Sequence, residues 1–328
     1  MNLNSYKGLL VYVEQRNEEL LNVGLELLGI GRDLADQIGT EVTAVLLGPN
    51  NKEFHKELIG YGADKVIIAP DEKLIKFNTE YYAHALTSII KDVKPEIVLV
   101  GATTIGRDFI PKVSARLGTG LTADCTKLEI SDEKELHSTR PAFGGNLMAT
   151  IVCKETRPQM SSVRPGVMVK KDFDPNRKGI TEIYDVNFNG ITSEVELLEE
   201  VIVKSDKIDI TEANILVSAG RGATKHMEYV INFADVISGE VSGSRGAVDQ
   251  GKVEQACQVG QTGKTVRPDL YIACGISGAI QHIAGMEDSD FIISINKDPD
   301  APIHQVASLG IVGNVEKILP ELIKQLRV

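Results

Sequence analysis

Two glycine-rich stretches in the last third of the chain contain residue types suited to binding a large phosphorylated cofactor. Residues 258–264 (Gln-Val-Gly-Gln-Thr-Gly-Lys) place an amide, a hydroxyl and a cation in one tight loop. Residues 275–282 (Gly-Ile-Ser-Gly-Ala-Ile-Gln-His) follow an apolar run and lead toward a helix. A strand, a glycine turn and a helix in this order offer free backbone N–H groups to a phosphate. We therefore expect a cofactor site in this region.

Neither of two well-known phosphate-binding motifs is complete in this chain. Residues 263–265 (Gly-Lys-Thr) resemble the end of a Walker A loop, but Gln258 stands where that motif has its first glycine. Gly220 and Gly222 lack the third glycine of a dinucleotide-binding turn. By pattern alone, residues 220–222 are more typical of a plain tight turn after a strand. For the loop at 258–264, a surface turn with Lys264 in solvent is the alternative.

The placement of several polar residues is more informative than any single motif. Arg221, Ser277 and Asn296 each come just after a predicted strand. In open α/β sheets such residues converge on the carboxyl edge, where ligands bind. Ser277 is also well placed as an N-cap, with His282 in the first helical turn. Taken singly, His282 and Arg245 are more typical of a structural histidine and an exposed turn arginine.

An alternation of strands and helices must position these residues. In the first part of the chain, short apolar runs at 9–13, 42–47, 66–68 and 97–100 predict buried strands, and amphipathic helical stripes separate them. This rhythm predicts an α/β fold with a mainly parallel sheet flanked by helices.

The pattern changes after residue 124. Residues 126–130, 137–143 and 147–152 read as successive strands, with a hairpin turn at 144–146. We expect these strands to extend the same sheet. Prolines then mark an irregular stretch after residue 157.

A polar, charged segment at 204–211 predicts the domain boundary, after which the alternation of strands and helices begins again. We therefore expect an N-terminal α/β domain at 1–204 and a C-terminal, Rossmann-like domain at 205–328. The C-terminal domain is expected to end in an amphipathic helix.

Composition excludes several classes of protein. The 328 residues carry a formal charge of −11, which argues against a nucleic-acid surface. No apolar stretch approaches the ~20 residues that cross a bilayer, and residues 1–7 do not resemble a signal or transit peptide. The four cysteines lie far apart and form no Cys-x-x-Cys pair, so we expect no metal cluster. These features predict a cytoplasmic protein.

The order of motifs in the C-terminal part closely resembles the alpha subunit of electron-transferring flavoproteins. The resemblance runs through nearly all of residues 215–326. It rests on residues 217–222 (Val-Ser-Ala-Gly-Arg-Gly), 243–245 (Gly-Ser-Arg) with Asp249, 258–264, 268–271 (Pro-Asp-Leu-Tyr), 275–282 and 296–298 (Asn-Lys-Asp). Residues 139–146 (Thr-Arg-Pro-Ala-Phe-Gly-Gly-Asn) and 163–166 (Val-Arg-Pro-Gly) in the N-terminal part also look like this family.

The resemblance implies one bound FAD in the C-terminal domain. It implies that Arg221, Ser244 and the turn at Ser277 hold the ribityl and pyrophosphate groups, and that residues 296–298 lie near the adenosine. It also implies that Gln261 and Thr262 face the isoalloxazine. The complete set of implied FAD-binding residues is Arg221, Ser244, Arg245, Val259, Gly260, Gln261, Thr262, Ser277, Gly278, Ala279, Ile280, Gln281, His282, Asn296, Lys297, Asp298, Asn314 and Val315.

Three further implications concern the isoalloxazine, and one position departs from the family. The Thr262 hydroxyl lies near flavin N5, Arg245 lies over the ring and His282 approaches the N1/O2 side. Cations and hydrogen-bond donors at these places favour the negative charge of a reduced flavin, whereas the redox chemistry belongs to the flavin itself. Relatives often carry aspartate where this chain has Asn314, which leaves the adenosine contact there in doubt.

The resemblance also implies partners. The family works as a heterodimer with a beta subunit, which holds AMP or a second FAD. The N-terminal domain would then serve assembly and docking, without a nucleotide of its own. The protein would be an electron carrier within a flavin-dependent redox complex, passing electrons between dehydrogenases.

Residues 13–16, 26–29 and 140–149 look like versions from anaerobic bacteria. Such complexes often bifurcate electrons from NADH between ferredoxin and an acyl-CoA dehydrogenase. Two alternatives from other classes stay open at this point. One is an NAD-dependent oxidoreductase on a doubly wound sheet, and the other is a non-redox nucleotide-binding assembly module.

Overall fold

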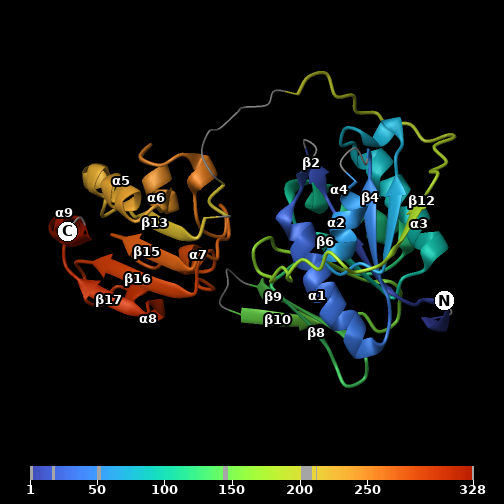
Figure 1. Ribbon diagram of the computed structural model, residues 1–328, viewed down its shortest axis with the longest axis horizontal. Helices are drawn as coiled ribbons and strands as arrows, with labels where there is room; N and C mark the ends of the chain where they lie inside the picture. Colours follow the sequence, from blue (N-terminus) through green and yellow to red (C-terminus); the bar gives the residue numbers. More distant parts are fainter. Residues whose placement is uncertain are drawn as a thin grey trace. The chain divides into compact units, whose positions relative to one another are not determined.

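The computed structural model describes residues 3–16, 19–49, 53–142, 147–200, 209–211 and 213–326 (Figure 1). These residues form two compact units. The first contains Met148–Glu200 and the described residues before 143, and the second contains those from 209 onward. The predicted domain boundary at 204/205 lies outside the described residues.

A parallel sheet of seven strands forms the centre of the N-terminal unit, in the order β12-β5-β4-β1-β6-β11-β7. Its strands β1, β4, β5 and β6 correspond to the four predicted apolar runs. The strands are β1 (Leu9–Tyr12), β4 (Val42–Leu47), β5 (Lys65–Ala69), β6 (Ile97–Gly101), β7 (Leu121–Cys125), β11 (Gln159–Val163) and β12 (Ile180–Ile183). A short ladder pairs β2 (Gln15–Arg16) with β3 (Glu19–Leu20).

Helices cover both faces of this sheet, which confirms the predicted α/β class. Leu28 of α1 and Leu58 of α2 are buried in the core on one face, whereas Leu86 of α3 and Phe109 of α4 are buried on the other. The helices are α1 (Asn22–Ile38), α2 (Phe54–Gly60), α3 (Thr79–Val93) and α4 (Thr104–Leu117), with 3₁₀ turns η1 (Leu3–Ser5) and η2 (Glu72–Leu74).

The expectation that residues 126–152 extend the same sheet is wrong. The strands β8 (Lys127–Ile130), β9 (Leu136–Ala142) and β10 (Leu147–Ile151) form a separate sheet in the order β10-β9-β8. The place beside β6 is taken by β11, which sequence analysis assigned to an irregular stretch. The predicted hairpin turn at 144–146 lies outside the described residues.

Strand β11 is buried although its sequence is polar, because neighbouring groups pair most of its polar side-chain atoms. Among the described residues, the Gln159 Nε2 has no hydrogen-bond partner. The Ser161 Oγ lies 2.7 Å from the Ser138 Oγ, and the Gln159 Oε1 accepts a hydrogen bond from the Leu136 N–H. The Ser162 Oγ accepts another from the Asp124 N–H. A buried polar group is tolerated where it is paired in this way.

The C-terminal unit contains a five-stranded parallel sheet in the order β14-β13-β15-β16-β17. In chain order this is 2-1-3-4-5, a doubly wound arrangement whose ligand position is the carboxyl edge between the first and third strands. The strands are β13 (Ile215–Ala219), β14 (Glu240–Gly243), β15 (Leu270–Cys274), β16 (Phe291–Asn296) and β17 (Leu309–Val312).

Two longer helices, α5 (Met227–Val236) and α9 (Val315–Leu326), pack together on one face of this sheet, and Val230 and Leu319 are buried there. The core on the other face contains Tyr271 and Ile303, the latter from α8 (Ile303–Val306). The unit also contains the short helices α6 (Arg245–Val248) and α7 (Ile280–Ile283) and the 3₁₀ turns η4 (Thr224–His226) and η5 (Gln255–Cys257). The predicted C-terminal amphipathic helix is therefore confirmed.

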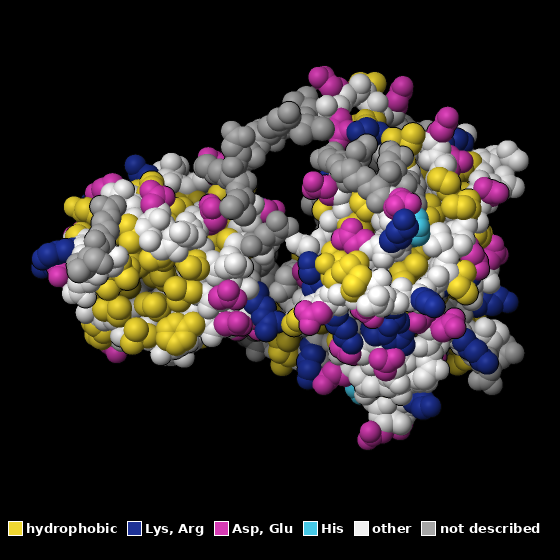
Figure 2. Space-filling view, viewed as in Figure 1, with side chains coloured by type: hydrophobic (Ala, Val, Ile, Leu, Met, Phe, Trp, Pro, Cys, Tyr) yellow, Lys and Arg dark blue, Asp and Glu magenta, His cyan; other side chains and the backbone are white. Residues whose placement is uncertain are grey.

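The surface carries mixed charge. Figure 2 shows acidic and basic side chains intermixed over the N-terminal unit. Among the described residues, no helix combines the length and apolar character needed to cross a membrane.

Candidate functional site

A cavity of about 800 Å³ lies at the carboxyl edge of the five-stranded sheet. We call it the C-terminal cavity. It is lined by Arg221, Gly222, Ser244, Arg245, Gly246, Gln258, Val259, Gly260, Gln261, Thr262, Gly275, Ile276, Ser277, Ala279, Gln281, His282, Asn296, Lys297, Asp298, Ala301 and Pro302. These residues come from the segments that follow β13, β14, β15 and β16, so the predicted convergence on one sheet edge is present.

Four residues of the predicted FAD-binding set do not line this cavity: Gly278, Ile280, Asn314 and Val315. Val315 is 4% exposed and belongs to the apolar core under α9. Asn314 directly precedes α9, and its carbonyl oxygen accepts the N–H groups of residues 317 and 318. Ile280 is 45% exposed. The other predicted residues all lie on the cavity wall.

The turn after β15 presents unpaired backbone donors. Within the part of the chain that the structure describes, the N–H groups of residues 277–281 have no hydrogen-bond acceptor. The helix α7 begins only at Ile280, with Ala279 as its N-cap and no side-chain cap, so the expected N-cap role of Ser277 is wrong. His282 does lie in the first turn, as predicted. A row of free N–H groups beside a cavity suits a phosphate.

Glycine is required where this turn meets the turn after β13. The N–H of Gly222 donates to the carbonyl oxygen of Gly275 at 3.1 Å. A Cβ on Gly220 would lie 2.2 Å from the Gly275 carbonyl oxygen, which leaves no room for a side chain. The two glycines therefore let the turns touch and bring Arg221 to the cavity.

Backbone hydrogen bonds join the loop at residues 258–264 to the turn at 279–283. The Gln261 N–H donates to the Gln281 carbonyl oxygen at 2.7 Å. The Thr262 Oγ1 accepts from the Gln258 Nε2 at 3.0 Å, so its hydroxyl proton is available to a ligand. Lys264 does not line the cavity, because its Nζ forms an ion pair with Asp209 at 2.8 Å.

His282 enters the cavity wall as a neutral imidazole. It is 7% exposed, and burial lowers its pKa to about 4. The Nδ1 lies 3.1 Å from the Val259 carbonyl oxygen, and the Nε2 lies 3.0 Å from the Tyr271 hydroxyl. A carbonyl oxygen can only accept, so Nδ1 carries the proton and Nε2 accepts from Tyr271. His282 therefore contributes shape and a dipole rather than a charge.

The cavity carries more positive than negative charge. Arg221, Arg245 and Lys297 line it together with Asp298. Among the described residues, neither Arg221 nor Lys297 has an ion-pair partner, whereas Arg245 is 3.7 Å from Asp249 and its side chain is 72% exposed. Unpaired cations beside free N–H groups fit an anionic ligand.

Asn296 holds two segments of the cavity wall together. Its Nδ2 donates to the Ile276 carbonyl oxygen at 2.7 Å, and its Oδ1 accepts from the Asp298 N–H at 3.0 Å. The end of β16 is thereby tied both to the turn after β15 and to the loop that carries Lys297.

Sequence reasoning missed seven wall residues: Gly222, Gly246, Gln258, Gly275, Ile276, Ala301 and Pro302. Most lie inside the quoted motifs and could have been included as neighbours. Ala301 and Pro302 carried no signal, because a tertiary contact places them. The Ile303 N–H donates to the Ser277 carbonyl oxygen at 3.2 Å.

The comparison with protein families agrees with this geometry. Residues 9–188 match the electron transfer flavoprotein domain, and residues 209–287 match the electron transfer flavoprotein FAD-binding domain. The chain belongs to the electron transfer flavoprotein alpha-subunit family. The C-terminal cavity lies within the FAD-binding domain of this family for most of its wall, and FAD is the cofactor of that domain.

Curated relatives cover the whole chain. The electron transfer flavoprotein subunit alpha of Clostridium acetobutylicum is 50% identical over 100% of this chain and 99% of its own length. Protein FixB of Clostridium saccharobutylicum is 51% identical over 99% and 98%. The electron transfer flavoprotein subunit alpha of Thermoanaerobacterium thermosaccharolyticum is 48% identical over 99% of both chains. These matches support a role in electron transfer.

The residues of the C-terminal cavity fit FAD. The row of N–H groups at 277–281 and the unpaired Arg221 suit a pyrophosphate. The space of about 800 Å³ is within the ~300–1,000 Å³ typical of cofactor sites. The chemistry of the donors therefore agrees with the family assignment.

Proposed function

We propose that this chain relays electrons between dehydrogenases as one half of a heterodimer with a beta subunit, using FAD held in the C-terminal cavity. The observation that carries the proposal is the cavity itself, whose wall brings together cations and N–H groups that have no partner among the described residues and lies mostly within the family's FAD-binding domain. FAD supplies the one- and two-electron redox chemistry when bound. The chain binds it and sets the charge around it.

Within this proposal, the wall residues divide into two groups. Arg221, Ser244 and the turn at Ser277 hold the phosphates and ribityl chain, and Lys297 lies toward the adenosine. The Thr262 hydroxyl and the Arg245 guanidinium act at the isoalloxazine, where a donor and a cation stabilise added negative charge. His282 adds no charge of its own, because burial lowers its pKa to about 4, and both its nitrogens are paired within the protein.

We further propose that the complex bifurcates electrons from NADH between ferredoxin and an acyl-CoA dehydrogenase. Two relatives support this by their names. One is the acryloyl-CoA reductase electron transfer subunit beta of Anaerotignum propionicum, 42% identical over 99% of this chain. The other is the LctC subunit of the lactate dehydrogenase (NAD(+),ferredoxin) of Acetobacterium woodii, 43% identical over 97% of this chain and 76% of its own length.

Counting flavins tests this function. The chain is co-expressed with the beta-like product of a neighbouring gene, and FAD is measured per heterodimer. One FAD, lost in an Arg221→Ala Lys297→Ala variant, supports a relay. Two FAD, with ferredoxin reduced by NADH only when an acyl-CoA acceptor and its dehydrogenase are present, support bifurcation. A colourless complex that takes up no FAD contradicts the proposed function altogether.

A further inference from the structure

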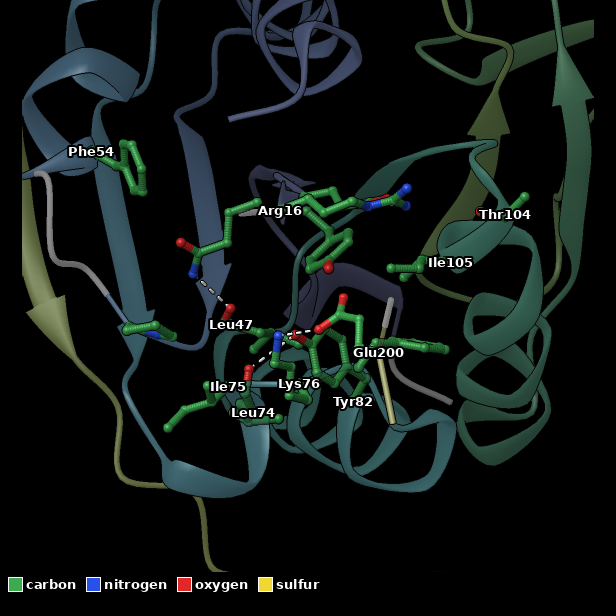
Figure 3. A pocket seen from close by; sticks show the side chains of 15 residues that line it. Arg16, Leu47, Phe54, Leu74, Ile75, Lys76, Tyr82, Thr104, Ile105 and Glu200 are labelled. Atoms are coloured by element: carbon green, nitrogen blue, oxygen red, sulfur yellow. Dashed lines mark hydrogen bonds and ion pairs between the residues drawn. The ribbon is translucent and has the colours of Figure 1, made fainter. Parts of the chain in front are cut away.

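A cavity of about 510 Å³ in the N-terminal unit balances the charges of its wall internally (Figure 3). Lys76 forms an ion pair with Glu200, and the Arg16 Nη2 donates to the Glu14 carboxylate at 2.7 Å. Each of these four charged side chains thus has a partner within the protein. The wall of the C-terminal cavity differs, because a buried side chain there makes a directed hydrogen bond to an exposed one.

Gln258 is the buried side chain of this pair, and Thr262 is the exposed one. Gln258 is 3% exposed, and both residues line the C-terminal cavity. The Gln258 Nε2 donates to the Thr262 Oγ1 at 3.0 Å. Sequence analysis placed Thr262 at the isoalloxazine and gave Gln258 no role. The contact shows that the two residues act as a unit.

The backbone of the loop that contains both residues brings these side chains together. The Lys264 N–H donates to the Gln258 carbonyl oxygen at 2.7 Å, which closes the loop on itself. A Cβ on Gly263 would lie 2.3 Å from the same carbonyl oxygen, so the closure requires glycine there. The Val259 N–H donates to the Gly243 carbonyl oxygen at 2.9 Å and ties the loop to the end of β14. Gln258 is therefore a fixed base beneath the tip of the loop.

The direction of the hydrogen bond decides what Thr262 offers to a ligand. A threonine hydroxyl has one proton and two lone pairs, whereas the NH₂ group of an amide can only donate. The hydroxyl proton of Thr262 therefore cannot point at Gln258 and is left for the cavity. The oxygen end of the Gln258 amide faces the other way, where the Gln255 Nε2 lies 3.4 Å from its Oε1. Thr262 thus presents a donor at the wall.

We propose that Gln258 is a positioning residue that holds the Thr262 hydroxyl as a hydrogen-bond donor toward N5 of the isoalloxazine. The inference rests on the proposed function, in which Thr262 acts at this ring. A donor aimed at N5 pairs with that nitrogen while it carries a lone pair, and faces a hydrogen once N5 is protonated. Gln258 thereby favours a flavin whose N5 carries no proton, and it does so through Thr262. No covalent bond forms or breaks in this role.

NMR of side-chain amides tests the pair in the full-length chain without FAD. The signal of the Gln258 NH₂ group is identified by its loss in Gln258→Met. We expect this signal to shift in Thr262→Val, because its hydrogen-bond acceptor is removed. It should stay in place in Gln305→Glu, which changes an exposed glutamine of α8 outside the cavity wall.

FAD labelled with ¹⁵N at N5 tests the direction of the bond in the loaded chain. A hydrogen bond to N5 lowers the chemical shift of that nitrogen, so we expect a lowered shift in the unmodified chain and its loss in Thr262→Val. Gln258→Glu should lose it as well, although the Thr262 hydroxyl remains, because a carboxylate accepts the proton of that hydroxyl. Gln305→Glu adds the same charge away from the wall and should keep the lowered shift.

A double-mutant cycle with a neutral substitution shows whether Gln258 acts through Thr262. Gln258→Met keeps the size of the side chain and removes its donor, so the Thr262 hydroxyl is free to turn. We expect it to weaken the binding of oxidised FAD about threefold to tenfold, the size of one hydrogen bond. In the Thr262→Val background the same substitution should change the dissociation constant by less than about twofold.

The inference is overturned if Gln258→Glu keeps the N5 shift of the unmodified chain, or if Gln258→Met weakens FAD binding equally with and without the Thr262 hydroxyl. It is also overturned if the Gln258 amide signal does not respond to Thr262→Val. Should Gln258→Glu fail to fold, the neutral cycle and the amide signal decide. An unmodified chain that binds no FAD contradicts the proposed function instead, whereas normal FAD binding without coupling of the two residues contradicts only this inference.

Discussion

At the scale of single residues, the charge of the C-terminal cavity comes from side chains that do little for the fold. Arg245 is the clearest case, because its side chain is 72% exposed and its only ion pair among the described residues is a 3.7 Å contact with Asp249. A residue with such weak internal contacts is free to act on a ligand. Its substitution should therefore change the reduction potential of the bound flavin and leave the stability of the protein unchanged.

Arg245→Ala is expected to lower the reduction potential of bound FAD, because a cation that stabilises added negative charge is lost. The expected change is about 1 kcal/mol, the size of one screened charge contact at the surface. A potentiometric titration of the FAD-loaded protein measures it. Lys252→Ala, which removes an exposed cation outside the cavity wall, is the control. Equal potentials in both variants would contradict the placement of Arg245 at the isoalloxazine.

His282 makes the C-terminal unit sensitive to acid. Burial lowers its folded-state pKa to about 4, whereas the unfolded chain has the usual value near ~6.5. As pH falls through this window the unfolded chain takes up the proton first, so stability is present above pH ~6.5 and is lost between ~6.5 and ~4. The loss amounts to about 3 kcal/mol.

Two variants check this prediction. His282→Gln should flatten the dependence of the unfolding free energy on pH in that window. Tyr271→Phe removes the donor to Nε2 that favours the neutral ring, so NMR titration should show a higher pKa for His282. If the His282 pKa stays the same in Tyr271→Phe, the hydroxyl does not set the state of the ring.

At the scale of elements, the shape of the C-terminal cavity depends on a residue that does not itself line it. Gly278 has φ +86°, and a Cβ there would lie 2.2 Å from the backbone nitrogen of Ile303. The turn after β15 is thus packed against the segment before α8, and this contact brings Ala301 and Pro302 to the wall. Gly278 lets this turn pack against Ile303, and its predicted contact with FAD stays a prediction.

Gly278→Ala is expected to weaken FAD binding at least about tenfold and to destabilise the C-terminal unit by more than ~2 kcal/mol, because backbone must move. Gly251→Ala is the matched control. Gly251 also has a positive φ, +66°, but nothing lies within 4 Å of its Cβ position. It should cost about 1 kcal/mol and leave FAD binding unchanged. Chemical denaturation and FAD titration measure both.

In the N-terminal unit, the partly buried carboxyl of Glu26 joins α1 to the segment after β11. Burial raises the pKa of Glu26 to about 7, despite a hydrogen bond from the Gly166 N–H at 2.9 Å. A raised carboxyl pKa gives stability below the unfolded value of ~4.5, and this stability is lost as pH rises to ~7. Glu26→Gln should remove this dependence, worth about 3 kcal/mol, in unfolding curves from pH 4.5 to pH 8. If the unfolding free energy of Glu26→Gln depended on pH as before, a group other than Glu26 would be responsible.

The elements show where the sequence was a sufficient guide. Continuous apolar runs such as 42–47 and 270–274 predicted buried strands, because a parallel strand covered on both faces needs apolar side chains throughout. Strand β11 was missed because Gln159, Ser161 and Ser162 are polar, and only its partners in β7 and β9 make their burial possible. The local sequence pattern around β11 does not reveal these partners.

The same limit applies to the C-terminal cavity. The residues of the predicted motifs do lie together on the wall of this cavity, because the carboxyl ends of the strands determine where they lie. Ala301 and Pro302 depend on the contact between Gly278 and Ile303, and Val315 lies in the core because α9 begins there. The neutral state of His282 depends on its burial, and the contact of its Nε2 with the Tyr271 hydroxyl exists only in the fold.

At the scale of the whole molecule, each of the two units has its own sheet and its own apolar cores. The FAD-binding match falls in the second unit. We therefore expect calorimetry of the full-length chain to show two unfolding transitions. FAD should raise the transition temperature of only one of them. At a hundredfold excess of FAD over its dissociation constant, the stabilisation is about 2.7 kcal/mol. A single transition, or an equal shift of both, would show that the units unfold together.

The cations of the C-terminal cavity are distributed over different loops. Arg221 follows β13, Arg245 follows β14 and Lys297 follows β16, and they share no bonding partner among the described residues. Substitutions at positions without common partners tend to have additive effects. Evolution could therefore adjust the reduction potential of the bound FAD in small, independent steps. Each step would replace one loop residue while the sheet beneath stays unchanged.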